Sequence, residues 1–247
     1  MNPAEARRYA RHVALPEIGP EGQERFLRAT VLLVLARHGE PQGASLALET
    51  AALYLGFAGV TRFAVVADGP DANGATPAAL RLVEALRQAL PQAHFTLVPR
   101  PLTGTAWQIA LGGISVGVRA DFEDDAFVLA CRDLGMPAVV ARAPSRDSDT
   151  PLDLLSLRPA GPSGAQAPSV PPPSVSSPDT PDQSGAVLAG TLAAAEALWV
   201  LAGRPPGDEA ATATGVMRHL RLPLAPFNAP PVTQNIPWPP NPPTEPA

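Results

Sequence analysis

The chain has 247 residues and a formal net charge of −5, with 45% hydrophobic and 17% charged residues. This length suffices for one sizeable core, and the 18 scattered Lys+Arg residues argue against a nucleic-acid-binding surface. The single cysteine excludes an internal disulfide and any multi-thiolate zinc site, and the four histidines show no ligand spacing. We therefore expect a cytoplasmic protein with no metal site.

The N-terminal part is expected to form two short helices, at 4–14 and at 21–28, separated by a break rich in proline and glycine. An apolar strand at 30–35 follows, and then a helix at 44–57 that ends at Gly59. The arginine-rich start has no apolar run behind it, so no signal peptide is expected.

Strands and helices continue to alternate along the body. Strands are expected at 62–67, 94–98, 114–118 and 138–141, and helices at 78–90 and 127–134. This alternation favours right-handed crossovers between parallel strands. The predicted fold class is α/β: a doubly wound, Rossmann-like, mostly parallel sheet with N-terminal helices and a proline-rich linker and tail.

Proline is the unusual residue, with 12 in the first 158 positions and 20 after them. Its distribution separates a folded body from proline-rich appendages. The expected organisation is an N-terminal helical segment at 1–29, a body at 30–158, a Pro/Ser-rich linker at 159–183, a C-terminal helix and strand packing on the body at 184–222, and a Pro-rich tail at 223–247. Such a tail is disordered, extended along the body, or a polyproline ligand for another protein.

The helix expected at 185–203 approaches the length of a membrane span. Alanine dominates it and Glu196 lies inside it, so we expect a buried helix with Trp199 in the core and no membrane partner.

The turn after the first strand is unsuited to binding a phosphate. A strand, a turn and a helix open many nucleotide-binding domains, whose glycines let the backbone approach the phosphate closely. Here the turn holds Arg37, His38 and Glu40, followed by Pro41, which has no N–H to donate. The sequence therefore indicates that this phosphate-binding loop has been lost.

The run RYARHVALPEIGPEGQER at 8–25 closely resembles the N-terminal signature of the ThiF/MoeB/HesA family, the ubiquitin-activating-type adenylyltransferases. The resemblance extends through the first strand, 53–60, 130–137 and the helix at 185–203. Enzymes of this family use ATP to adenylate the C-terminal carboxylate of a small β-grasp protein. They need a glycine loop, an acid on the ribose, basic residues on the triphosphate and a carboxylate that holds magnesium.

The resemblance implies which of these groups survive. Asp68 supplies one acid after the second strand, but Ala67, Gly69 or Pro70 falls where the family has the other. The segment 71–76 lacks the family's arginine, and Ala78 stands where its lysine is expected. Asp121 matches the magnesium-side aspartate. Arg11 matches an arginine that reaches across the dimer into the partner's ATP site.

The residues that would act on the chain's own nucleotide are mostly missing, whereas Arg11, which would act in trans, is present. We therefore expect a non-catalytic dimerisation or regulatory subunit of a system that activates a ubiquitin-like or sulfur-carrier protein. It would form a homodimer, or a heterodimer with an active ThiF-like enzyme, and need no cofactor. One alternative is an ATP- and magnesium-dependent adenylyltransferase acting on such a carrier, and a second is an interaction module that uses its proline-rich segments.

Each candidate residue also has a structural explanation. Arg11 fits a solvated helix position, and Cys131 fits a buried thiol on an apolar helix. The acids at 121 and 123–125 fit a helix N-terminus, where the helix dipole favours negative charge, better than a metal cluster.

Overall fold

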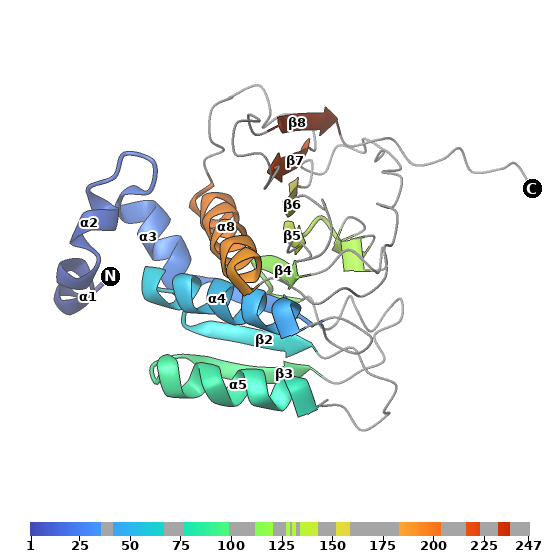
Figure 1. The fold of residues 1–247 in the computed structure, drawn as a ribbon. Helices are drawn as coiled ribbons and strands as arrows, with labels where there is room; N and C mark the ends of the chain where they lie inside the picture. Colours follow the sequence, from blue (N-terminus) through green and yellow to red (C-terminus); the bar gives the residue numbers. More distant parts are fainter. Residues whose placement is uncertain are drawn as a thin grey trace, which may run out of the picture.

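The structure is a computed structural model of the 247-residue chain. It describes residues 1–35, 42–66, 77–98, 112–120, 127–128, 130–131, 134–142, 152–158, 183–203, 216–222 and 232–237. The described strands form one eight-stranded sheet in the order β3-β2-β1-β4-β5-β6-β7-β8, with helices packed against it (Figure 1).

Five parallel strands form the first part of the sheet. They are β1 (Thr30–Val34), β2 (Arg62–Val66), β3 (His94–Val98), β4 (Val116–Ala120) and β5 (Ala138–Arg142). β1, β2 and β3 proceed outward on one side, and the chain then crosses β1 to place β4 and β5 on the other. This is the doubly wound α/β fold expected from the sequence, although β4 begins and ends two residues later than expected.

Three antiparallel strands extend the sheet beyond β5. They are β6 (Leu152–Arg158), β7 (Val216–Leu222) and β8 (Val232–Pro237). β6 was not predicted from the sequence, and it is buried along nearly its whole length. β8 lies within the segment 223–247, which was expected to be a Pro-rich tail. Its six residues pair with β7 as an extended edge strand.

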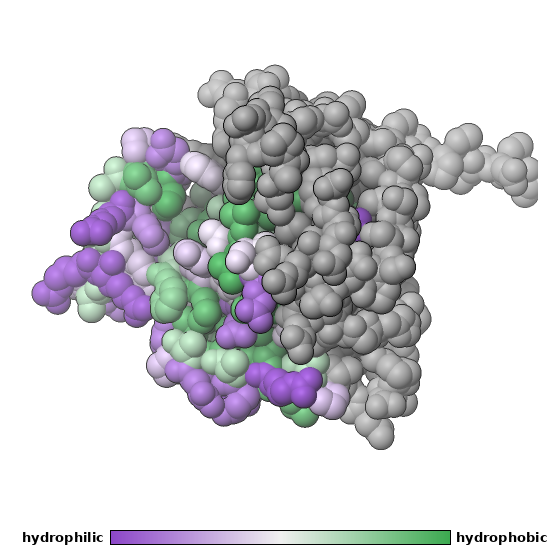
Figure 2. All heavy atoms as spheres, viewed as in Figure 1, coloured by the Kyte–Doolittle hydropathy of each residue, from purple (hydrophilic) through white to green (hydrophobic). Residues whose placement is uncertain are grey.

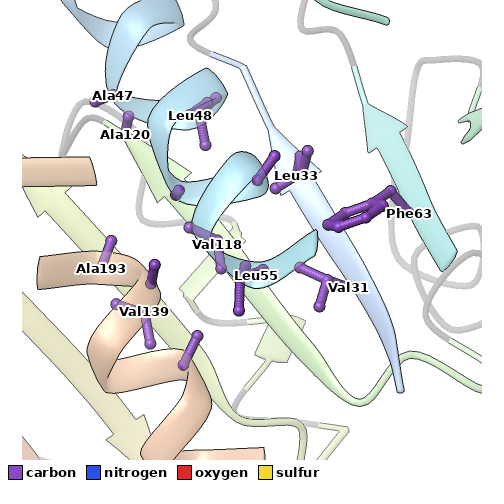
Figure 3. Close-up of a cluster of buried hydrophobic side chains, with 14 of the residues drawn as sticks. Val31, Leu33, Ala47, Leu48, Leu55, Phe63, Val118, Ala120, Val139 and Ala193 are labelled. Atoms are coloured by element: carbon purple, nitrogen blue, oxygen red, sulfur yellow. The ribbon is translucent and has the colours of Figure 1, made fainter. Parts of the chain in front are cut away.

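Two long helices, α4 (Gln42–Ala58) and α8 (Gln183–Ala202), pack closely against each other over one face of the sheet. α5 (Pro77–Ala89) lies beside α4 over β2 and β3. Leu48 and Leu55 of α4 and Ala193 of α8 belong to the same buried cluster as alternate residues of the central strands (Figure 3). A second, smaller core on the opposite face includes Phe127.

Three short helices precede the sheet: α1 (Pro3–Arg8), α2 (Ala10–Val13) and α3 (Gly19–Arg28). Asn2 begins α1 with a capping box, in which its side chain accepts from the Glu5 amide and the Glu5 carboxylate accepts from the Asn2 amide. α3 contacts α8, whereas α1 and α2 lie at the outer end of the molecule (Figure 1). They form an N-terminal arm, which we define as residues 1–14.

α8 is a helix of the protein core, although its length and apolar composition would also allow it to cross a membrane. Its buried side consists almost entirely of alanine and glycine, apart from Glu196, which forms a 3.0 Å ion pair with Arg158 of β6. Trp199 was expected in the core but is only partly buried. The small residues explain how α8 approaches α4 so closely.

Gly190 marks the closest approach of α4 and α8. A Cβ atom at this position would lie 2.2 Å from the Ala47 carbonyl oxygen, in the backbone of α4. We predict that Gly190→Val lowers the free energy of unfolding by about 1–3 kcal/mol, because the two helices must separate. Urea denaturation measures the change. Ala195→Val, on the exposed side of α8, is the matched control and should unfold like the wild type; equal stabilities of the two variants would contradict the prediction.

Candidate functional site

The carboxyl ends of β1 and β4 are where this fold is expected to bind a ligand. The chain leaves β1 toward β2 and later returns to β4 on the other side, so the connections diverge at this point, which is where folds of this class have their ligand-binding crevice. Val34 of β1 pairs with Arg119 of β4 in the last register position of these two strands. Within the described residues, Val34, Leu35 and Ala120 make this edge of the sheet apolar and buried.

Arg119 is a buried cation beside this edge, and it was not among the site residues predicted from the sequence. Its side chain is 1% exposed, on the sheet face that carries the smaller core. By strand register, Arg142 of β5 and the buried Asp153 of β6 face the same side. The expected strand ended at residue 118 and left Arg119 in a loop. The alternation of Val116, Val118 and Ala120 on the other face was the signal that could have placed it in the strand.

The two acidic candidates, Asp68 and Asp121, lie outside the described residues. So do the turn residues 36–41, the segment 71–76 and the acids at 123–125. Their proposed roles therefore remain predictions. Among the described residues, no group of three or more His, Cys, Asp or Glu is arranged to hold a metal ion.

Arg11 lies far from the crevice of its own chain. It is exposed on α2, and the neighbouring His12 contacts Gln23, whose side chain in turn contacts Ala58 at the C-terminus of α4. The crevice lies at the other end of α4, because that helix begins after the carboxyl end of β1. A 17-residue helix is about 25 Å long, so Arg11 lies roughly that far from the crevice, beyond the reach of one side chain (Figure 1).

Cys131 is buried against the smaller core, and burial raises the pKa of its thiol well above the ordinary value. A thiol held in its protonated form is a poor nucleophile, because the thiolate is the reactive species. The structure thus agrees with the structural role expected for this cysteine.

Comparison with solved structures identifies proteins of similar fold. E. coli MccB in complex with MccA-N7isoASN matches with a TM-score of 0.59 and 11% identity, over 94% of this chain and 73% of the MccB chain. E. coli MccB with ATP matches with a TM-score of 0.58 and 10% identity, over 94% of this chain and 72% of the MccB chain. PaaA matches with a TM-score of 0.58 and 12% identity, over 96% and 84%.

MccB is a microcin C7 biosynthetic enzyme, also known in complex with N-formylated MccA. At these identities the likeness shows the fold, which is the ThiF-like α/β fold expected from the N-terminal motif. No family model and no curated protein sequence matches the chain.

We predict that Cys131 is unreactive in the folded protein. At pH 8 an aromatic disulfide reagent should modify it slowly in buffer and rapidly in denaturant, because unfolding exposes the thiol and removes the cause of its raised pKa. The free energy of unfolding should also fall as the pH rises above 9.0, the ordinary pKa of a thiol, since only the unfolded thiol then releases its proton. Equal modification rates in buffer and denaturant would refute the burial of this residue.

Proposed function

We propose that the protein is a non-catalytic, ThiF-like subunit that dimerises and contributes Arg11 to a partner in a system activating a ubiquitin-like or sulfur-carrier protein. The observation that carries the proposal is the position of Arg11, which is exposed but separated from its own crevice by about the 25 Å length of α4. An arginine placed in this way is out of reach of its own crevice, so a site that uses it would belong to another molecule. The partner is a second copy of the chain or an active relative.

The described residues at the crevice edge do not fit an ATP site, which supports a non-catalytic role. The chain contains no lysine, since all 18 of its Lys+Arg residues are arginine. The described crevice edge is apolar, and its one cation, Arg119, is fully buried rather than directed at solvent. A triphosphate needs several accessible cationic donors, because each charge-assisted hydrogen bond offsets part of the cost of removing its oxygens from water.

Exposed apolar side chains on the outer face of α4 and α8 support dimerisation. Tyr54 and Phe57 of α4 are 51% and 58% exposed, and Val187 and Leu188 of α8 are 42% and 39% exposed. Green, apolar atoms gather where α4 runs in Figure 2, whereas much of the N-terminal arm is purple. A helix apolar on all sides, as α8 is, normally has its whole surface covered. We therefore assign this face to the dimer contact.

Calorimetric titration of the full-length chain with ATP and magnesium tests the non-catalytic role. We expect no heat of binding at millimolar ATP, because the described crevice edge offers no accessible cation to the triphosphate. Binding that is abolished by Asp121→Ala would overturn the proposal and establish a functional nucleotide site.

Light scattering tests the dimer contact. We predict that Phe57→Glu and Leu188→Glu convert a dimer into a folded monomer, because each places an unpaired charge in an apolar interface. Leu80→Glu is the matched control, since Leu80 is 50% exposed on α5, outside the proposed face, and should leave the mass unchanged. Variants that remain dimeric would contradict the assignment of this face, and a monomeric wild-type chain would exclude a second copy of the chain as the partner.

The alternative function is an ATP-dependent adenylyltransferase acting on the C-terminus of a ubiquitin-like or sulfur-carrier protein. It is favoured by the likeness to an MccB structure that contains ATP, across 94% of this chain. Pyrophosphate exchange that requires Asp121 would support this alternative over the leading proposal.

A further inference from the structure

The N-terminal arm is attached to the body by a chain of side-chain hydrogen bonds. Gln23 of α3, which is fully buried, donates from Nε2 to the Ala58 carbonyl oxygen at 2.8 Å. Its Oε1 lies 2.9 Å from Nδ1 of His12 in α2. The two bonds connect the C-terminus of α4, through α3, to the residue next to Arg11.

The chemistry of the groups involved fixes which atom donates in each of these two hydrogen bonds. A carbonyl oxygen only accepts, so the Gln23 atom that faces Ala58 must be the amide nitrogen, and the atom that faces His12 is then the amide oxygen. Since that oxygen also only accepts, His12 must carry a proton on Nδ1. The His12 ring is further held by stacking on Tyr9, with ring centroids 5.9 Å apart.

The turn after α4 leaves room for the Gln23 side chain that forms these hydrogen bonds. Gly59 has a φ of 117°, and the amides of Gly59 and Val60 bond back to Gly56 and Leu55 in a Schellman motif. A Cβ atom on Gly59 would lie 2.7 Å from the Gln23 Nε2 atom and 3.3 Å from the Tyr9 ring. Only glycine therefore permits both the turn and the contact.

The arm has few other attachments. α1 has six residues and α2 has four, and neither helix contains a buried residue. Helices this short are not stable on their own in water, so contacts with the body must hold them in place. Tyr9, between the two helices, is buried, and the terminal amine of Met1 forms a 3.3 Å ion pair with Glu24.

We infer that Gln23, acting through His12, is a positioning residue that fixes the direction in which the arm presents Arg11. The significance of that direction rests on the proposed trans role of Arg11, whereas the geometry of the chain of bonds does not. Arg11 is exposed and forms no hydrogen bond or ion pair with the other described residues, so its direction is set by the helix that carries it and not by a contact of its own.

The test measures where residue 11 lies relative to the body, without a partner. Nitroxide labels are attached to Arg11→Cys and to Arg81→Cys on the exposed side of α5, outside the proposed dimer face. The labelled chain is diluted with unlabelled chain, so that pulsed electron resonance gives the distance distribution between the two labels of one chain. The buried Cys131 should remain unlabelled. We expect one narrow peak in this background, because the arm is held in a single position.

His12→Leu removes the arm-side hydrogen bond together with the stacking on Tyr9, and should replace the narrow peak with a broad distribution, while the melting temperature changes little. Gln23→Leu should also broaden the distribution, and it should lower the melting temperature because the buried Ala58 carbonyl loses its donor. His12→Asn should keep the narrow peak, because its amide nitrogen stands where Nδ1 of His12 does and can donate to Gln23. The matched control is Gln88→Leu, which removes an exposed glutamine hydrogen bond to Glu84 on α5 and should leave the peak narrow.

A narrow peak that persists in both His12→Leu and Gln23→Leu would overturn the inference, and would leave the proposed function standing. Conversely, ATP binding in the calorimetric titration would overturn the proposed function but not the measured position of the arm. Broadening in Gln88→Leu as well would also refute the inference, since the effect would then not be specific to this chain of bonds.

Discussion

The C-terminal carbonyl groups of α4 and α8 need hydrogen-bond donors, and α3 supplies a donor to each. An α-helix leaves its last carbonyls without partners, and a buried carbonyl without one is costly. Gln23 donates to Ala58 at the end of α4, and Arg25 donates to Ala202 at the end of α8. α3 therefore fixes the relative position of the two helices that form the main core, and the N-terminal arm is attached to the same helix.

This constraint explains two glycines that follow the helices. Gly59 and Gly203 both have positive φ values, and a Cβ atom on either would collide with the donor side chain from α3. Each position thus needs glycine twice, for the left-handed backbone and for the space that the donor occupies. α4 and α8 approach closely at Gly190 for a similar reason, because glycine has no side chain to fill the space between the two helices.

Much of the fold follows from local patterns in the sequence, because strand and helix periodicities repeat in a regular α/β order. The polar contacts within the core do not follow from such patterns. Arg158 and Glu196 are 38 positions apart, and Gln23 and Ala58 are 35 apart, so no local signal pairs them. β8 was not predicted for another reason, since its polar residues, its terminal Pro237 and the prolines around it indicate a tail, whereas pairing with β7 makes it a strand.

The candidate site was likewise only partly predictable from the sequence. The resemblance selected Arg11 for a role in trans, which stays a prediction. The structure shows Arg11 exposed on the N-terminal segment, and the sequence could not show that α4 separates it from its own crevice. Arg119 was missed because a charged residue at the end of an apolar run indicates the start of a loop, and only the sheet register shows it to be buried.

The residues of the N-terminal motif at 8–25 have two kinds of role. Tyr9, His12, Gln23 and Arg25 hold the arm and the helix ends in place, so the fold alone requires them. The motif can therefore be present in a chain that performs no ATP chemistry. Arg11 differs from these four, because it is exposed and its position is determined by its neighbours. Arg11 forms no hydrogen bond or ion pair with the other described residues, and for this reason the proposed trans role depends on it.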